Sequence, residues 1–190
     1  MTENAVAANG RTPATSGAGL WIALIAALTV IGSYGFACVA PLAAVAALAA
    51  LTLNRTEGLI LVVAVWVLNQ AVGFVLLSYP HTPDTYAWGA AIGAATVLGY
   101  LAASAATPRT GSALIAAAVA FAAAFVVYQV GLYAFGVATA YTGDTFSLAV
   151  VGEVLTINAV AYVGFLVIHR AAVALSLVKP VEAPSASLSA

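Results

Sequence analysis

Residues 20–53 contain no charged side chain, and so long an apolar stretch restricts the chain to folds that bury it in lipid or in protein. A single helix of about 34 residues would be about 51 Å long at about 1.5 Å per residue. The hydrocarbon core of a bilayer is only about 30 Å thick, so that about 20 apolar residues suffice for one crossing. Glycine, serine and proline residues between Gly32 and Pro41 favour a tight turn. We therefore expect two short helices, at 20–36 and 39–54.

Charged residues are scarce in the remainder of the chain as well. Hydrophobic residues make up 64% of the 190 residues and charged residues 6%, against about 25% charged in an average soluble domain. Short polar segments containing proline, glycine or charge divide the sequence at 54–57, 78–84, 107–111 and 141–145. Further spans are expected at 57–79, 86–106, 112–140 and 146–169. The sequence thus predicts an all-α, polytopic membrane protein with about six transmembrane helices in one membrane domain, residues 20–177.

Polar segments flank this domain at both ends of the chain. Residues 1–19 and 178–190 are expected to form cytoplasmic tails, the first of them disordered. The first apolar segment is longer than the apolar core of a signal peptide, about 7–15 residues, and Pro41 disfavours cleavage at the one candidate site. We therefore expect a retained helix. The single cysteine, Cys38, provides neither a disulfide framework nor metal-binding spacing.

The basic residues give the expected orientation of the six spans. With this topology all five lie on the same side of the membrane: Arg11, Arg55, Arg109, Arg170 and Lys179. The opposite loops contain no lysine or arginine, only His81, Asp84 and Asp144. Because basic residues accumulate in cytoplasmic loops, both termini are expected in the cytoplasm, and the protein in the plasma membrane as a multi-pass protein.

Polar side chains inside the expected spans are the candidates for a binding site, because they are costly to place in hydrocarbon. They are Asn69, Gln70, Gln129, Tyr133, Glu153 and Asn158. In one interpretation they line a cavity open to the outer side, in which Glu153 binds a cation or a proton. In the other, the amides hydrogen-bond neighbouring helices together. Glu153 and Asn158 lie about 140° apart around a helix, so they need not face the same cavity.

Sequence motifs for catalysis are absent. The chain contains no Walker A sequence, no Gly-x-Ser-x-Gly and no His-Glu-x-x-His. One histidine and one carboxylate, His81 and Asp84, do not make a metal site. We instead expect Asp84 and Asp144 to cap the helices that follow them. The missing motifs argue against an enzyme and against a resident cofactor or metal. The net charge of −1 argues against a nucleic-acid partner.

In size and expected topology, residues 20–170 resemble the substrate-binding S components of energy-coupling-factor transporters. These are small bacterial inner-membrane proteins with six helices, cytoplasmic termini and an outward-facing pocket for a vitamin or a metal ion. The resemblance implies docking of the first helix, through small residues such as Ala23 and Ala27, on a coupling subunit that works with ATPases. The segment Met1-Thr2-Glu3 lacks the histidine of the metal-binding members, which argues against nickel and cobalt.

Two other classes of function remain open. Six apolar helices joined by amides would also suit a non-transporting accessory or scaffold subunit of a larger membrane complex. A third class is a proton- or cation-coupled permease, which would act as a dimer because six helices are few for a single copy. An uptake component predicts a bound small molecule, whereas a scaffold predicts a stable protein partner and no ligand.

Overall fold

The computed structural model describes residues 16–35, 40–107, 111–141 and 143–177, and within these residues the chain is α-helical without a strand. The helices are α1 (Ser16–Gly35), α2 (Leu42–Thr52), α3 (Arg55–Ala71), α4 (Pro83–Ala106), α5 (Ala113–Ala138) and α6 (Leu148–Ala174). A π-helical segment, η1 (Val72–Leu76), continues α3, and a 3-10 turn, η2 (Asp144–Phe146), precedes α6. The all-α prediction is confirmed.

Four of these helices are long and apolar enough to cross a membrane. They are α3 with η1, α4, α5 and α6, with 22, 24, 26 and 27 residues. At about 1.5 Å per residue each is longer than the hydrocarbon core, about 30 Å. Their length and composition are those of a membrane protein. α1 begins at Ser16 rather than at residue 20, and the remaining tail residues, 1–15 and 178–190, lie outside the described ranges.

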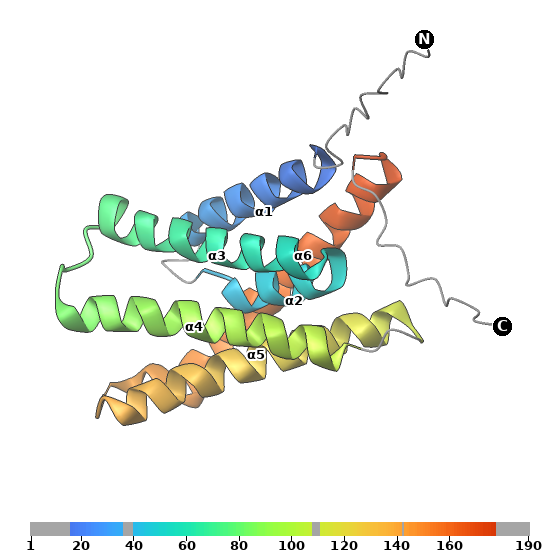
Figure 1. Cartoon of the computed structure of the whole chain (residues 1–190). Coiled ribbons are helices and arrows are strands. Elements are labelled where there is room, and N and C mark those ends of the chain that lie inside the picture. The colour runs from blue at the N-terminus through green and yellow to red at the C-terminus, as the bar shows by residue number, and fades with distance from the viewer. Residues whose placement is uncertain (1–15, 36–39, 108–110, 142, 178–190) are drawn as a thin grey trace, which may run out of the picture.

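The long helices α3, α4, α5 and α6 run in alternating directions, so that their termini gather at two ends of the bundle (Figure 1). The turn from α2 to α3, the end of α4, the start of α5 and the last turn of α6 lie at one end, which carries Arg55 and Arg170. The segments after η1 and around η2 lie at the other end, which carries His81, Asp84 and Asp144. We call these the Arg55 end and the Asp84 end. The two arginines that the structure describes are thus separated from the loop acids, as the sequence predicts.

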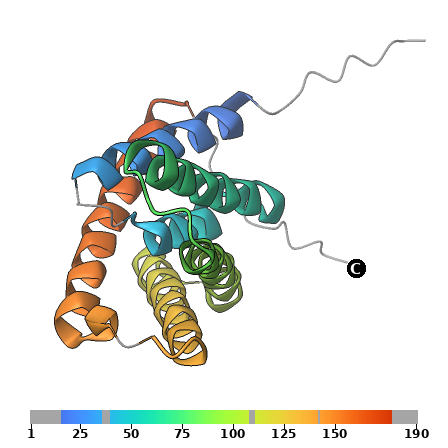
Figure 2. The ribbon, with the colours of Figure 1, turned by 90° about the vertical axis from the view of Figure 1, so that its left-hand side faces the viewer.

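The short helix α2 occupies the centre of the bundle and contacts α3, α4, α5 and α6 (Figure 2). Its side chains are buried without interruption from Leu42 to Ala49. It has 11 residues, which is about 16 Å at about 1.5 Å per residue. The predicted second span, 39–54, is therefore corrected to a half-length helix that is too short to cross. Protein surrounds α2, so its length need not match the bilayer, and its alanines let four helices approach closely.

Oxygen-bearing side chains begin the four long helices, because the first backbone N–H groups of a helix lack partners within it. The capping residues are Asn54, Thr82, Ser112 and Ser147. The predicted cap at Asp84 is wrong: Thr82 accepts the hydrogen bond from Thr85 N, and Asp84 lies within the first turn. There its negative charge still favours the helix N-terminus. Asp144 likewise starts η2 instead of capping α6.

Close packing of α3 on α4 depends on two glycines and one tryptophan. The indole Nε1 of Trp66 donates to the carbonyl oxygen of Gly89 at 2.9 Å. A Cβ atom added to Gly93 would lie 2.5 Å from Trp66 Cε2. The indole of Trp66 fits between the two helices because Gly93 presents no side chain there, and Gly89 accepts its hydrogen bond through the backbone.

Candidate functional site

A cavity of about 280 Å³ opens near the Asp84 end between α3, α4, α5 and α6. Most of its lining is aliphatic or aromatic, and four of its residues carry a hydroxyl or carboxamide group. The lining residues are Ala40, Leu42, Asn69, Trp88, Ile92, Tyr128, Gln129, Leu132, Thr145, Phe146, Val150 and Val154. Mostly apolar walls with a few polar groups are typical of small-molecule sites, whose volumes are about 300–1,000 Å³. The volume here lies at the lower end of that range.

The half-length of α2 explains why the cavity exists. α5 packs along α4, whereas α6 contacts α5 over only a short stretch and diverges from it. α2 fills the space between them toward the Arg55 end. Because α2 begins only at Leu42, no helix among the described residues fills the same space toward the Asp84 end. Ala40 and Leu42 form the floor of the resulting cavity, and the four long helices form its walls.

Three polar groups in the cavity wall have no hydrogen-bond partner among the described residues: the carboxamides of Asn69 and Gln129 and the hydroxyl of Tyr128. Tyr128 is 8% exposed, so its ring is fixed by packing. Polar groups inside proteins are nearly always hydrogen-bonded. Each carboxamide both donates and accepts. These groups are therefore available to a bound molecule or to water.

Aromatic side chains surround the cavity at the Asp84 end. Trp88 of α4 packs edge-to-face on Phe135, with ring centroids 4.8 Å apart, and on Tyr141, 5.2 Å apart. Phe146 of η2 packs edge-to-face on Tyr133 of α5 at 5.4 Å. A Cβ atom at Gly136 would lie 2.9 Å from the ring of Phe146, so this glycine makes room for the cap. We call these five aromatic residues, Trp88, Tyr133, Phe135, Tyr141 and Phe146, the aromatic cap.

Two of the six site residues predicted from the sequence, Asn69 and Gln129, line the cavity together. Tyr133 does not line it, but it contacts Phe146, which does. Gln70 faces α4 instead: a Cβ atom at Gly89 would lie 2.7 Å from its Oε1. Of the two neighbouring carboxamide residues in the third predicted span, Asn69 therefore faces the cavity and Gln70 lies at the contact between α3 and α4.

The two polar residues of α6 lie outside the cavity. Asn158 is buried, and its amide is used within the bundle: Oδ1 accepts from Ala44 N at 3.1 Å and Nδ2 donates to Val154 O at 2.9 Å. Glu153 is exposed on the surface of α6 that faces away from α2. The wide angle between these two residues is as predicted, and it is Asn158 that faces inward.

Sequence reasoning missed the aromatic contribution to the site. Tyr128, Trp88 and Phe146 all line the cavity. Trp88 lies near the start of the predicted span 86–106, and a tryptophan near a helix end indicates the membrane interface rather than a binding site. Tyr128 is adjacent to Gln129, but α5 is apolar on all sides, so no periodic pattern indicates which of its faces is inside.

In comparisons with known proteins, no family model, no curated protein and no solved structure matches the chain. Its function therefore has to be inferred from the chemistry of the cavity and of the bundle surface. On that surface, Ala23 and Ala27 are exposed one turn apart on α1, beside the exposed Leu24.

Proposed function

We propose that the chain is an integral membrane uptake component that binds a small organic molecule in the cavity at the Asp84 end. The observation that carries this proposal is the unpaired polar groups of Asn69, Gln129 and Tyr128 within an otherwise apolar cavity. A purely structural amide would be hydrogen-bonded to another helix, as Asn158 is. Groups held in place without a partner are characteristic of a site that awaits a ligand.

A neutral ligand fits the cavity better than a cation. No charged side chain among the described residues lines it, and Glu153, the expected cation ligand, lies elsewhere. Transfer of an unpaired ion into such surroundings is costly. The carboxamides suit a molecule with both donors and acceptors, and Trp88, Tyr128 and Phe146 suit a planar apolar body. A small vitamin-like compound has this chemistry.

We further propose that both termini lie in the cytoplasm and that the cavity opens outward, in the plasma membrane. The Arg55 end carries Arg55 and Arg170, and basic residues mark the cytoplasmic side. α1, with 20 residues and no charged side chain, would then be a fifth crossing helix beside the half-length α2. The exposed Ala23 and Ala27 would meet coupling and ATPase subunits.

The decisive experiment identifies what the full-length protein carries. Wild type and the variants Asn69→Leu and Gln129→Leu are purified in detergent, and small molecules released by denaturation are identified by mass spectrometry. One organic compound enriched with wild type and lost from both variants is expected, together with uptake that depends on it. Equal recovery from the three proteins, or no compound from any of them, would refute the proposal.

A second function, an accessory subunit of a membrane complex, is favoured by the exposed surface of α1. Ala23 and Ala27 leave room for a second helix to approach, and small residues promote such contacts in membranes. This function predicts a protein partner that co-purifies with wild type but not with Ala23→Trp or Ala27→Trp. It also predicts that Asn69→Leu has no effect on the function of the complex.

A further inference from the structure

A second cavity, of about 520 Å³, lies at the Arg55 end, far from the aromatic cap. It opens between the turn from α2 to α3 and the last turns of α4. Its lining residues are Ala50, Leu53, Arg55, Tyr100, Leu101, Ser104, Ala105 and Thr107. It therefore combines one cationic side chain with hydroxyl groups and an apolar wall, unlike the uncharged cavity at the Asp84 end.

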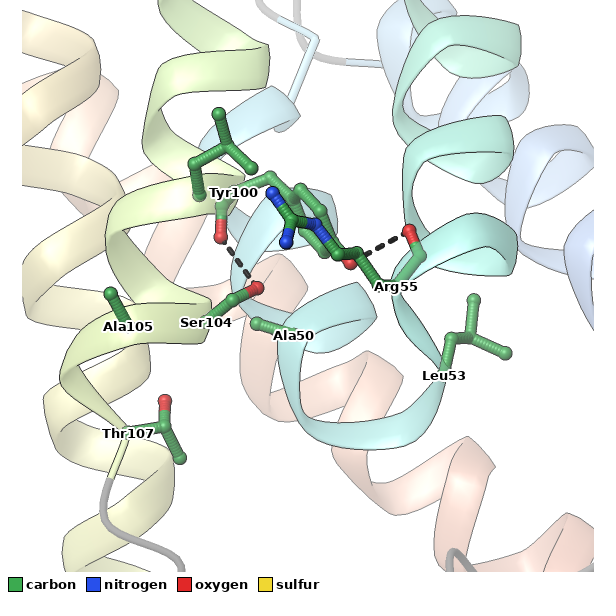
Figure 3. A pocket seen from close by; sticks show the side chains of 8 residues that line it. Ala50, Leu53, Arg55, Tyr100, Ser104, Ala105 and Thr107 are labelled. Carbon is green, nitrogen blue, oxygen red and sulfur yellow. Dashed lines mark hydrogen bonds between the residues drawn. The ribbon is translucent and has the colours of Figure 1, made fainter.

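Arg55 is the only charged residue in this lining, and its side chain points from the start of α3 toward Tyr100 and Ser104 on α4 (Figure 3). The residue is exposed, and no carboxylate of the described residues forms an ion pair with it. A guanidinium group presents five N–H donors in a planar fork that matches phosphate oxygens. Glu57 in the first turn of α3 offsets the partial positive charge of that helix N-terminus, so the guanidinium of Arg55 is the group that attracts an anion to this cavity.

Hydrogen bonds fix the backbone and the hydroxyl groups around Arg55. The hydroxyl of Tyr100 donates to the carbonyl oxygen of Arg55 at 3.2 Å, and Ser104 Oγ donates to the carbonyl oxygen of Tyr100 at 2.8 Å. Thr107 Oγ1 donates to Ala103 O at 2.6 Å. These hydroxyl hydrogens are used inside the protein, so the Ser104 and Thr107 oxygens face a ligand as acceptors.

We propose that this cavity binds an anionic phospholipid whose headgroup carries free hydroxyl groups, as phosphatidylglycerol does. The Arg55 guanidinium pairs with the phosphodiester, and the headgroup hydroxyls donate to Ser104 and Thr107. The apolar wall of Leu53, Leu101 and Ala105 covers the glycerol backbone and the first acyl carbons. Basic pockets between transmembrane helices bind anionic headgroups in this way.

The apolar wall favours a lipid over free phosphate as the source of the anion. Inorganic phosphate would use Arg55 alone and leave the apolar half of the cavity without a contact. A single exposed arginine attracts an anionic lipid by about 1 kcal/mol, which corresponds to about a fivefold change in occupancy. Packing of the glycerol backbone and the first acyl carbons against Leu53, Leu101 and Ala105 adds to that attraction, and free phosphate cannot make these contacts.

Native mass spectrometry of the full-length protein in detergent tests the site with three probes: phosphatidylglycerol, phosphatidylcholine and inorganic phosphate. We expect phosphatidylglycerol adducts to exceed phosphatidylcholine adducts. Arg55→Gln should lower phosphatidylglycerol occupancy about fivefold. Ala105→Trp, which fills the apolar half but keeps the charge, should lower it as well. Gln at position 55 keeps the backbone carbonyl that Tyr100 binds, so the fold is retained.

Arg170→Gln is the matched control, because Arg170 is also exposed at the Arg55 end but does not line the cavity. It should leave occupancy at the wild-type level. The proposal fails if Arg170→Gln and Arg55→Gln reduce binding equally, or if the two lipids bind alike. It also fails if inorganic phosphate displaces phosphatidylglycerol completely or if Ala105→Trp has no effect, since either result would place the anion outside the apolar groove.

Discussion

The side chain of Asn158 on α6 caps the buried helix α2 from outside: its Oδ1 accepts a hydrogen bond from the backbone N–H of Ala44 at 3.1 Å. Ala44 is the third residue of α2, where N–H groups have no partner within the helix. The donation from Asn158 Nδ2 to Val154 O at 2.9 Å fixes the amide in this orientation. The carbonyl oxygens of Ala40 and Pro41 accept from Leu42 N and Val45 N, and Asn158 supplies the acceptor for Ala44 N from a different helix.

Asn158→Leu should therefore destabilise the protein while leaving the ligand cavity in place. The substitution removes the hydrogen bond of Ala44 N and leaves this buried N–H group without a partner. Loss of such a capping bond costs about 1–2 kcal/mol, so the free energy of unfolding should fall by up to about 2 kcal/mol. Denaturation in detergent, followed by tryptophan fluorescence, measures the change. Thr156→Val, on the exposed side of the same helix, should stay within about 0.5 kcal/mol of wild type. Equal stability of Asn158→Leu and Thr156→Val would contradict the capping role.

Asn69→Leu and Gln129→Leu should behave in the opposite way. Their amides form no hydrogen bond within the described part of the chain, so there is no bond to lose. Replacing a polar group in an apolar cavity by an aliphatic one should leave the free energy of unfolding unchanged or raise it by about 1 kcal/mol. The same denaturation assay is used, with Asn158→Leu as the comparison. A loss of stability similar to that of Asn158→Leu would show that these amides hold helices together instead.

Helix boundaries could be read from the sequence with good accuracy because local chemistry determines them. Asn54 caps α3 by accepting from Glu57 N, and this is the short charged turn at which the sequence predicts a break. The Pro-rich segment before Pro83 and the Ser112 cap likewise coincide with predicted connections. Each of these signals acts within a few residues, so no knowledge of the tertiary structure is needed.

Inward and outward faces could not be read in the same way. α5 and α6 are apolar around their whole circumference, because one side meets protein and the other meets lipid. The sequence therefore could not tell that Asn158 faces α2 and that Glu153 faces away. The length of α2 could not be predicted for a related reason. The absence of charge in 39–54 indicates an apolar environment, but the sequence does not distinguish a helix surrounded by protein from one that spans the lipid.

Gly58→Ala should disturb the contact between α3 and α4. A Cβ atom at Gly58 would lie 2.5 Å from the hydroxyl oxygen of Tyr100, whose ring is 1% exposed and held by Arg55 O. Overpacking of this kind costs about 1–3 kcal/mol of unfolding free energy. Gly164→Ala is the control, because nothing lies within 4 Å of a Cβ atom there.

A double variant distinguishes a local clash from a general helix effect at Gly58. Gly58→Ala combined with Tyr100→Leu should lose less stability than the sum of the two single changes, because the smaller side chain leaves room for the added methyl group. The interaction free energy is obtained from the four denaturation curves of the double-mutant cycle. Strict additivity would mean that Tyr100 is not the group that Gly58 accommodates.

Cysteine accessibility tests the proposed orientation of the bundle. In a Cys38→Ala background, Asp84→Cys and Leu177→Cys place single thiols at opposite ends, both on exposed residues. A membrane-impermeant maleimide added to intact cells should label the first and spare the second until the membrane is permeabilised. Labelling of position 177 in intact cells would reverse the orientation, and labelling of both positions would contradict a fixed topology.

Phe146→Ala should open the cavity beneath the aromatic cap. Phe146 lines the cavity and is held against Tyr133, so its removal takes away one wall at the Asp84 end. The rate at which a small thiol reagent modifies Val150→Cys, a position in the same lining, should rise severalfold in the Cys38→Ala background. Wild-type Phe146 with the same cysteine gives the reference rate.

Tyr86→Ala provides the matched control for this opening, because it removes an aromatic ring from the same end of the bundle but from a separate cluster. Tyr86 stacks on Phe74, with centroids 5.1 Å apart, and its hydroxyl bonds His81 Nδ1 at 2.7 Å. None of these three residues lines the cavity. The modification rate at position 150 should therefore stay at its reference value. If Tyr86→Ala accelerates labelling as much as Phe146→Ala, the whole end of the bundle is loosened and Phe146 does not control access to the cavity.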